Sequence, residues 1–376
     1  MDGRVRILGG GIGGLTAALA LRHHGIDCEV HERAPELAEI GAGLGLWPNA
    51  LSVFDRLGIG DKVRALSGPW EVAGLRRADG RYMVRYSANE MTARLGEPTI
   101  GVHRGELQAL LVNELADGTL HLGQEAESVD DRPGGPVLVR LVDGTQLDAT
   151  AVIAADGRRS RVRAGLFGER PLHVCKAVGW RGTAPEPEGA GWARQVGETW
   201  SGNLRFGILP ISGGRVTWYA AARSFLDGGS RDELRARFGH LHGPIPALIE
   251  ATPEEAIWRD QIDDLFPRRQ WVRGRVALMG DAAHPMTPDL GQGACHAVLD
   301  AWALAGALAA HPDVTVALER YQRERYRSAA RMVLIARAAS SSSGNGSRLG
   351  SALAEAVVSR VPRGAALRGL ARVVAG

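Results

Sequence analysis

The sequence of 376 residues predicts a mixed α/β protein with an interleaved second domain of β-sheet and a helical C-terminus. Three observations support this fold class. An apolar strand at the N-terminus leads into a glycine-rich turn and a helix-type pattern. Two further ligand-type motifs stand at residues 154–163 and 280–293. Short alternating segments, typical of antiparallel strands, fill much of the chain between them. If the three motifs serve one ligand, their domain must be assembled from discontinuous pieces of chain.

The N-terminal motif follows the apolar run at residues 5–8. Gly9, Gly11 and Gly14 match the G-x-G-x-x-G spacing, in which glycines allow a tight turn, close approach of a pyrophosphate and close packing of helix on strand. Glu32 follows the next predicted strand at about the ~20-residue distance where a carboxylate meets an adenosine ribose. This pattern predicts a Rossmann-like dinucleotide site. A purely structural glycine turn is the alternative, and it leaves Glu32 without a role.

The other motifs indicate which dinucleotide binds. Asp156-Gly157 follows an apolar strand and precedes Ser160 and Arg163, and residues 276–285 end in Gly280-Asp281-Ala-Ala-His-Pro before a Gly291-Gln-Gly segment. Together with His103-Arg104 and the glycine-rich loop at 41–51, these motifs resemble the class A flavoprotein aromatic hydroxylases. Those enzymes are single-component FAD-dependent monooxygenases with the para-hydroxybenzoate hydroxylase fold. The resemblance covers about residues 5–335.

The resemblance implies that FAD is the cofactor. Asp281 is expected to bond to the ribityl chain, although a helix N-cap is an alternative role. The helix that opens at Gly291–Ala294 would turn its positive end towards the pyrimidine side of the flavin. Cys295 and Leu299 depart from the residues usual in the family, which blurs the subfamily but not the cofactor. The residues expected to bind FAD are Gly9, Gly11, Gly13, Gly14, Glu32, Arg33, Arg104, Asp281, Gly291, Gly293 and Ala294.

The family's reaction implies that NADH or NADPH reduces FAD transiently, which fits the lack of a second G-x-G-x-x-G motif. Oxygen then forms a flavin hydroperoxide, and one oxygen atom goes to a small aromatic substrate by hydroxylation or epoxidation. Two alternatives stay open: an FAD-dependent dehydrogenase or reductase on the same scaffold, and a flavin-bound regulatory protein without turnover.

Several residues are candidates for the reaction itself. Pro288 matches the family proline beside the reactive flavin carbon, with a pre-helix spacer as the alternative. His284 has a side chain suited to proton transfer, although the family's histidine here is usually part of the framework. Arg181, flanked by Gly179 and Gly182, could pair with a substrate carboxylate or phenolate. Alternation along strands leaves open which side chains face the substrate. The further candidates are Trp180, Phe206, Trp218 and Tyr219.

We predict that residues 1–70, 101–171 and 273–340 form the FAD-binding domain. Residues 71–100 and 172–272 form the substrate-binding sheet, with hairpin signals at Asp79-Gly80 and Gly213-Gly214. Ser230 and Glu233 suggest a capped surface helix. Residues 341–376 are expected to hold a linker and C-terminal helices.

Composition narrows the range of partners. The formal charge is +3, and five arginines lie beyond residue 347, so the body of the protein has little excess charge to bind nucleic acid. Three scattered cysteines make a disulfide or metal site unexpected, and a cytoplasmic monomer or homodimer fits. No signal peptide or membrane-spanning segment is expected. The amphipathic C-terminal tail should fold back and cover the domain junction near the pocket, with an anionic membrane surface as the alternative.

Overall fold

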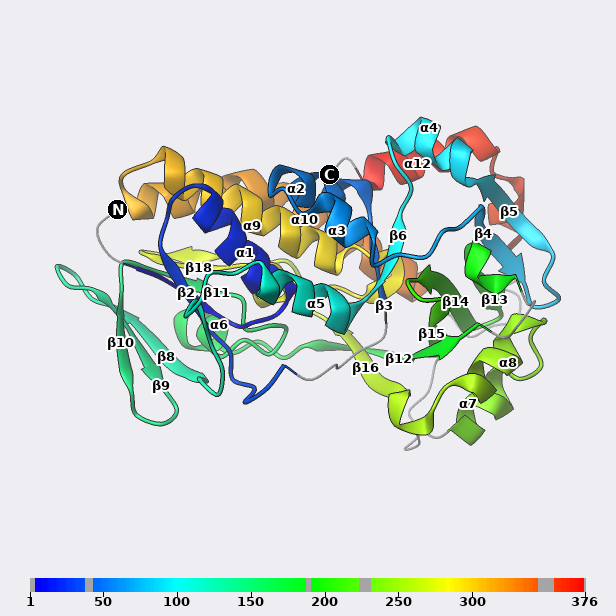
Figure 1. Ribbon diagram of the computed structural model, residues 1–376, viewed down its shortest axis with the longest axis horizontal. Helices are drawn as coiled ribbons and strands as arrows, with labels where there is room; N and C mark the ends of the chain where they lie inside the picture. The colour runs from blue at the N-terminus through cyan, green and yellow to red at the C-terminus, as the bar shows by residue number, and fades with distance from the viewer. Residues whose placement is uncertain (1–3, 38–42, 187–190, 223–230, 344–354, 375–376) are drawn as a thin grey trace.

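A computed structural model describes residues 4–37, 43–186, 191–222, 231–343 and 355–374 (Figure 1). Its six-stranded sheet has the order β17-β18-β11-β1-β2-β7. All neighbouring pairs are parallel except β17 with β18. The fold class predicted from the sequence is confirmed. The strands are β1 (Val5–Leu8), β2 (Cys28–His31), β7 (Leu120–His121), β11 (Ala151–Ala154), β17 (Val272–Arg273) and β18 (Val276–Leu278).

Helices cover this parallel sheet, which explains why its central strands read as continuous apolar runs. Every residue of β11 and of β18 is buried. Helix α9 packs against α1, α2 and α10. The helices of this part are α1 (Ile12–His23), α2 (Pro48–Arg56), α3 (Gly60–Arg64), α5 (Arg104–Asn113), α6 (Arg161–Phe167), α9 (Gly293–Ala310) and α10 (Val314–Ser343).

The second large sheet has seven strands, in the order β16-β12-β15-β14-β13-β4-β5. Both predicted hairpins are present, since β4 pairs antiparallel with β5 and β14 with β15. Its strands come from two separate stretches of chain, while the domain boundaries themselves stay a prediction. The strands are β4 (Val72–Arg77), β5 (Tyr82–Ser87), β12 (His173–Pro185), β13 (Gln195–Ser201), β14 (Leu204–Ile211), β15 (Arg215–Ala222) and β16 (Trp258–Asp264).

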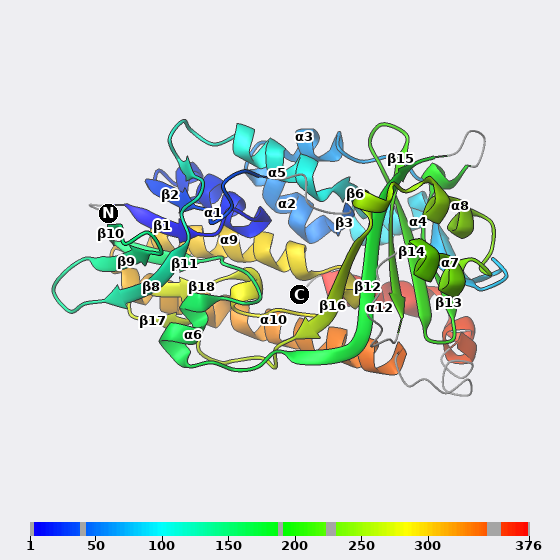
Figure 2. The same cartoon turned by 90° about the horizontal axis from the view of Figure 1, so that it is seen from below.

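The two faces of this sheet have different neighbours (Figure 2). Helices α7 (Arg231–Phe238) and α8 (Pro244–Ala251) cover the outer face. The opposite face, which we call the inner face, meets the FAD-binding part through β3 (Gly43–Leu46) and β6 (Ile100–His103). There the Gly43 amide donates to Thr217 Oγ1 over 2.6 Å. The inner face is therefore the one directed at the nucleotide-binding motifs.

Smaller elements complete the fold. A three-stranded sheet has the order β10-β9-β8, and α4 and α12 lie beside each other near β5 (Figure 1). Short 3₁₀ turns span Trp192–Arg194, Glu254–Ala256, Gly280–Ala282 and Pro288–Leu290. The remaining elements are β8 (Ala126–Asp131), β9 (Val137–Leu141), β10 (Gln146–Ala149), α4 (Ala88–Leu95) and α12 (Arg363–Val374).

The end of helix α10 differs from the sequence-based prediction. The predicted cap of helix α7 falls on a residue that the structure does not describe. Helix α10 continues to Ser343, three residues into the segment that was expected to hold the linker. Helix α7 begins at Arg231, and its predicted cap Ser230 lies outside the described residues.

Among the described residues, α9 is long and apolar enough to cross a membrane by length and composition. Its surroundings show another reason for this composition. The helix contains Asp300 and His296, both buried, and it packs among α1, α2 and α10. Helix α9 has the environment of a core helix.

The described part of the C-terminal tail docks on the edge of the seven-stranded sheet formed by β4 and β5. Val358 and Leu367 pack against a cluster around Trp70 and Met91. Arg77 of β4 forms an ion pair with Glu355 over 3.1 Å. This arrangement agrees with the docked tail expected from the sequence.

Candidate FAD and substrate site

The N-terminal glycine turn has the geometry of a nucleotide cradle. Gly9 has φ +115°, a conformation that side chains rarely adopt. A Cβ on Gly14 would overlap the Gly9 carbonyl, whereas a Cβ on Gly11 would meet no atom within 4 Å. Gly11 is the N-cap of α1 without a side-chain cap, so its first N–H groups face an open space. An anion such as a pyrophosphate fits this position.

Glu32 is fixed beside the same turn. Its carboxylate accepts hydrogen bonds from the Gly10 amide at 2.6 Å and from the Ala34 amide at 2.9 Å. The amide of buried Gln108 donates to the Gly10 carbonyl over 2.7 Å and steadies the turn from the other side. Neighbouring Arg33 is exposed. Of the two predicted contacts, Glu32 is held in place by the fold and Arg33 is not.

Three predicted FAD residues from separate parts of the chain converge electrostatically. Desolvation lowers the pKa of Arg104, while the carboxylates of Glu32 and Asp281 oppose that shift. Burial also disfavours the charged form of Asp281 and so raises its pKa. Four nearby groups act in the opposite direction and lower it, namely His284, Arg158, Arg181 and Arg104. Asp281 is nevertheless an exposed residue. A side chain that lines a concave surface is expected to be surrounded by protein atoms and yet to remain accessible to solvent.

The start of α9 lies next to Asp281. A Cβ on Gly293 would come 3.9 Å from Asp281 Oδ1. Gln292 is the N-cap and gives no side-chain cap, so the backbone N–H groups of Gly293 and Ala294 point out of the helix end. Gly291 has φ +60° and makes the turn into this helix. Pro288 is exposed at the start of the preceding 3₁₀ turn, a placement that fits either role considered for it.

His284 is not on this surface. It is buried, and its Nε2 lies 2.6 Å from Asp300 Oδ2. Asp300 also accepts from the Gly280 amide at 3.0 Å and from Arg325 Nε at 2.8 Å. The assignment of His284 as a catalytic residue is corrected, because it braces the loop before Asp281 from behind.

The strand register resolves which aromatic side chains face the site. Trp180, Phe206 and Trp218 are at most 1% exposed and pack beneath α7 and α8 on the outer face. Their assignment as substrate-binding residues is therefore wrong: they form the core of this domain. Tyr219, the neighbour of Trp218, lies on the inner face, where it is the register partner of Arg181.

Arg181 lies on the inner face close to the FAD-type residues. Desolvation lowers its pKa, and its charge interacts with those of Asp260, Arg158, Arg104 and Asp281. The residue is exposed, as Asp281 is. Arg181 thus lies at the boundary of the two parts, where a substrate anion would meet both.

Two further polar residues on the inner face were missed by sequence reasoning. Glu198 on β13 accepts a hydrogen bond from the Tyr219 hydroxyl over 2.5 Å. Arg205 on β14 lies 3.8 Å from Glu198 and stacks over the Trp200 ring at 4.3 Å. Arg205 is the charged residue of the otherwise apolar strand β14, and that was a signal that could have identified it, because such strands seldom bury a charge without a partner. The mixed composition of β13 gives no such signal for Glu198.

The residues present fit FAD. The open space at Gly11, the carboxylate of Glu32 near a nucleotide turn, and two helix N-termini without side-chain caps provide sites for phosphate, ribose and flavin oxygens. Glu32, Arg104, Asp281 and Gly293 would hold the cofactor between α1 and α9.

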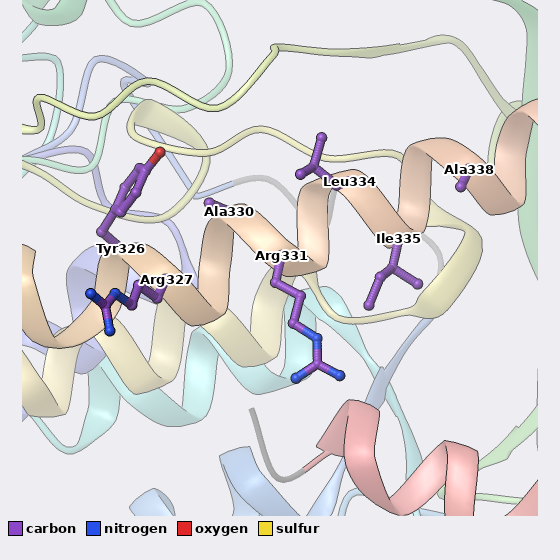
Figure 3. A pocket seen from close by; sticks show the side chains of 7 residues that line it. All are labelled: Tyr326, Arg327, Ala330, Arg331, Leu334, Ile335 and Ala338. Atoms are coloured by element: carbon purple, nitrogen blue, oxygen red, sulfur yellow. The ribbon is translucent and has the colours of Figure 1, made fainter.

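Two other features were considered as sites. His173, Cys175 and Asp264 have ligand-type atoms within 4.8 Å of one another. Arg337 already donates to both oxygens of Asp264, at 2.6 and 2.7 Å, so we assign no metal to this group. An apolar hollow lies along residues 326–338 of α10 (Figure 3). Among the described residues that line it, the charged ones are Arg327 and Arg331, and we assign no chemistry to it.

Fold and site together define an FAD-binding α/β enzyme with a second, seven-stranded sheet. The chain belongs to the FAD binding domain family, whose model matches residues 2–336. It is 42% identical over 323 residues to the aurachin C monooxygenase/isomerase of Stigmatella aurantiaca, covering 85% of this chain and 84% of that protein. It is 33% identical over 344 residues to an FAD-dependent urate hydroxylase of Klebsiella pneumoniae, covering 88% of each.

A solved structure shows the same fold throughout. The Klebsiella pneumoniae HpxO protein, crystallised with FAD and uric acid, superposes with a TM-score of 0.92 at 28% identity. The match covers 99% of this chain and 96% of that one. The protein is accordingly an FAD-dependent monooxygenase, as the resemblance predicted, and FAD is its cofactor.

Proposed function

We propose that the protein inserts one oxygen atom from O₂ into a small, electron-rich aromatic or heteroaromatic ring, using NADH or NADPH as the reductant. One observation carries the proposal: Arg181, Tyr219 and Glu198 lie in register on the inner face. Burial lowers the pKa of Arg181, and the charge of Asp281 opposes that shift. Burial and the charge of Asp289, from the turn before α9, raise the pKa of Tyr219 and of Glu198. When bound, FAD supplies the electron transfer and the oxygen activation. The oxygen-transfer route predicted from the sequence is part of this proposal.

The residues of the chain supply binding and electrostatics. Arg181 offers a planar donor to a carboxylate or phenolate. The N–H groups at the start of α9 would stabilise negative charge on a flavin bound there. Tyr219 and Glu198 orient the substrate ring. The relatives support a ring with polar substituents, since they are named for urate, 6-hydroxynicotinate and 3-amino-4-hydroxybenzoate.

The test is a turnover assay with these three compounds. NADH or NADPH oxidation is followed with each, and ¹⁸O₂ labelling with mass spectrometry identifies any oxygenated product. We expect at least one compound to accelerate oxidation and to gain one ¹⁸O atom. Accelerated oxidation with no labelled product would indicate a reductase instead. If a broad panel of aromatic and heteroaromatic compounds gave no stimulation, a regulatory protein would be the better description.

A further inference from the structure

The C-terminal tail covers part of the inner face of the seven-stranded sheet. Val196 of β13 and Ala73 of β4 are register partners, and Val196 lies two residues before Glu198. Since residues two apart in a strand share a face, all three belong to the inner face. Val358 and Leu367 of the tail pack, as Val196 does, against the cluster that contains Ala73. The tail therefore lies over β4, beside the part of the inner face that carries the proposed substrate residues.

The tail meets this surface at a row of three side chains. Trp200 of β13 is the register partner of Arg205 on β14 and of Arg77 on β4. The Arg205 guanidinium lies over the Trp200 ring, 4.3 Å from its centroid. Arg77 Nη1 donates to Glu355 Oε2 over 3.1 Å, and its Nη2 donates to Ser359 Oγ over 3.0 Å. A continuous row of contacts thus joins the tail to Arg205.

The tail carboxylate contributes to the charge at this end of the inner face. Burial lowers the pKa of Arg205, and the negative charge of Glu355 is one of the effects that oppose this shift. The Glu355 side chain is 18% exposed and that of Arg205 is 9% exposed, so water screens their interaction less than at an open surface. Glu198 and Asp289 act on Arg205 in the same direction as Glu355. Carboxylates from three separate parts of the chain therefore surround this arginine.

The opposite end of the inner face has different chemistry. Arg181 lies on β12, four steps from β4 in the strand order, which is about 19 Å between the two backbones at ~4.8 Å per step. The acidic group of a ligand can pair with Arg181, as proposed above. At the tail end, Arg77 and Arg205 already have acidic partners, at 3.1 and 3.8 Å. An anionic group that reached this end would meet carboxylates, and charges placed in this way discriminate against the wrong ligand.

We propose, on the basis of the function proposed above, that the tail forms a side wall of the substrate site and that Glu355 keeps anionic groups away from this wall. The substrate class is an aromatic compound with its acidic group at one end, towards Arg181. The other end of the compound, which meets Trp200 and the tail, is uncharged. Glu355 is thus a specificity-determining residue, because it affects which ring compounds bind and takes no part in oxygen transfer.

The test compares two-ring ligands that carry one or two carboxylates. The probes are naphthalene-2-carboxylate beside naphthalene-2,6-dicarboxylate, and biphenyl-4-carboxylate beside biphenyl-4,4′-dicarboxylate, because in each diacid the second carboxylate lies at the far end of the molecule. Dissociation constants for the FAD-loaded enzyme are measured by calorimetry without NADH or NADPH. The variants are Glu355→Gln and Arg77→Gln. Glu250→Gln is the control, since Glu250 is an exposed carboxylate that pairs with Arg235 on the outer face of the same sheet.

We expect the parent and Glu250→Gln to bind at least one monocarboxylate about tenfold more tightly than its dicarboxylate. Glu355→Gln should reduce this preference to about threefold or less, because Arg77 can then pair with the second carboxylate. Arg77→Gln should keep the preference, because Glu355 loses its opposing charge and retains its own. The FAD content of each variant shows whether it is folded.

Equal affinity of the parent for both members of each pair, including no measurable binding of either, would overturn the proposal. So would an unchanged preference in Glu355→Gln. Loss of the preference in Arg77→Gln as well as in Glu355→Gln would also overturn it, because displacement of the tail would then explain the result better than its charge. Labelled product in the turnover assay together with equal affinities would leave the monooxygenase function standing and remove this role of Glu355. A preference that depends on Glu355, without any labelled product, would support the charged wall and remove the proposed reaction.

Discussion

At the scale of single residues, the ligand-facing surface depends on a few charged side chains held by backbone groups or by each other. Glu32 is held by the amides of Gly10 and Ala34, so its carboxylate is already positioned beside the nucleotide turn. Arg181 lies where the sheet domain meets Arg104 and Asp281. Each of these two residues supports a prediction.

Glu32→Ala should weaken FAD binding, because a ribose hydroxyl loses its charged acceptor. The expected loss is about 1.5–3 kcal/mol, typical of a hydrogen bond to a charged group. Fluorescence titration of the apoprotein with FAD measures it. Glu36→Ala, an exposed carboxylate nearby, is the control. Equal FAD affinity in the parent and Glu32→Ala would remove Glu32 from the cofactor site.

Arg181→Ala should raise KM for an acidic substrate about tenfold or more, because an anion loses a charge-assisted donor. Neutral substrates should be affected little. Steady-state kinetics on 6-hydroxynicotinate and on its carboxamide separate the two cases. Arg22→Ala, at the exposed end of α1, provides the matched control. Identical KM values for Arg181→Ala and the parent on an acidic substrate would contradict this role.

At the scale of elements, the two helix starts proposed to face the cofactor are each supported by contacts behind them. The turn into α1 depends on backbone packing between Gly9 and Gly14. The loop before α9 depends on the buried network of Asp300, His284 and Arg325. The glycine turn before α1 should therefore affect ligand access, and the Asp300 network before α9 should affect the stability of its loop.

Two glycine variants should separate folding from cofactor binding. In Gly11→Ala the new Cβ meets no protein atom within 4 Å, so the apoprotein should keep its Tm while FAD binding falls sharply. In Gly14→Ala the Cβ overlaps the Gly9 carbonyl, so the apoprotein itself should be destabilised. Thermal unfolding of both apoproteins, followed by FAD titration, distinguishes them. Full FAD affinity in Gly11→Ala would show that no phosphate approaches Gly11.

Asp300→Asn should destabilise the protein by about 3–5 kcal/mol, because it leaves Arg325 and His284 without their buried partner. Burial alone would raise the pKa of Asp300, but the charges of His284 and Arg325 outweigh it and lower the pKa below its ordinary value. A lowered carboxyl pKa gives stability that is present above the unfolded-state pKa of about 3.9 and is lost as pH falls below it.

The same variant should therefore alter the acid limb of stability. Urea unfolding between pH 2.5 and 7 should show that the parent loses more stability below about pH 4 than Asp300→Asn does. Asp313→Asn, at the exposed start of α10, is the control. Parallel pH profiles for the parent and Asp300→Asn would mean that the buried pair does not contribute in this way.

At the scale of the whole molecule, the C-terminal tail packs against strands and a helix that lie far from it in sequence. Val358 and Leu367 complete a cluster with Trp70, Val84 and Met91, and Glu355 pairs with Arg77. These contacts lie away from the residues expected to bind FAD. The tail should therefore affect the stability of the substrate domain more than it affects the flavin.

Truncation after Gly346 should lower Tm while leaving the flavin absorption spectrum unchanged. Leu367→Asp should reproduce part of the loss, because an apolar contact of the cluster is replaced by a charge. Val357→Ser, at a position that is 55% exposed, should change Tm little. Co-sedimentation with anionic vesicles tests the alternative. An unchanged Tm on truncation, together with vesicle binding by the full chain, would favour a membrane-facing tail.

The sequence by itself determined the local features that depend on near neighbours. The glycine turn at Gly9–Gly14, both hairpins and the FAD motifs could be predicted because spacing and turn chemistry are local properties. The resemblance of those motifs to aromatic hydroxylases supplied the class of enzyme, which the family match and the named relatives together confirm. Helix α10 runs to Ser343, into the segment expected to be a linker, because composition locates a helix end only to within a few residues.

Only the tertiary structure decided which side of the substrate sheet faces the cofactor. Alternation separates Trp180 from Arg181 and Trp218 from Tyr219 but does not say which member is buried. The packing of α7 and α8 over Trp180, Phe206 and Trp218 settles that choice. The pairing of Glu198 with Tyr219 and the burial of His284 against Asp300 likewise join residues distant in sequence. Contacts of this kind arise from chain packing, so no local pattern in the sequence encodes them.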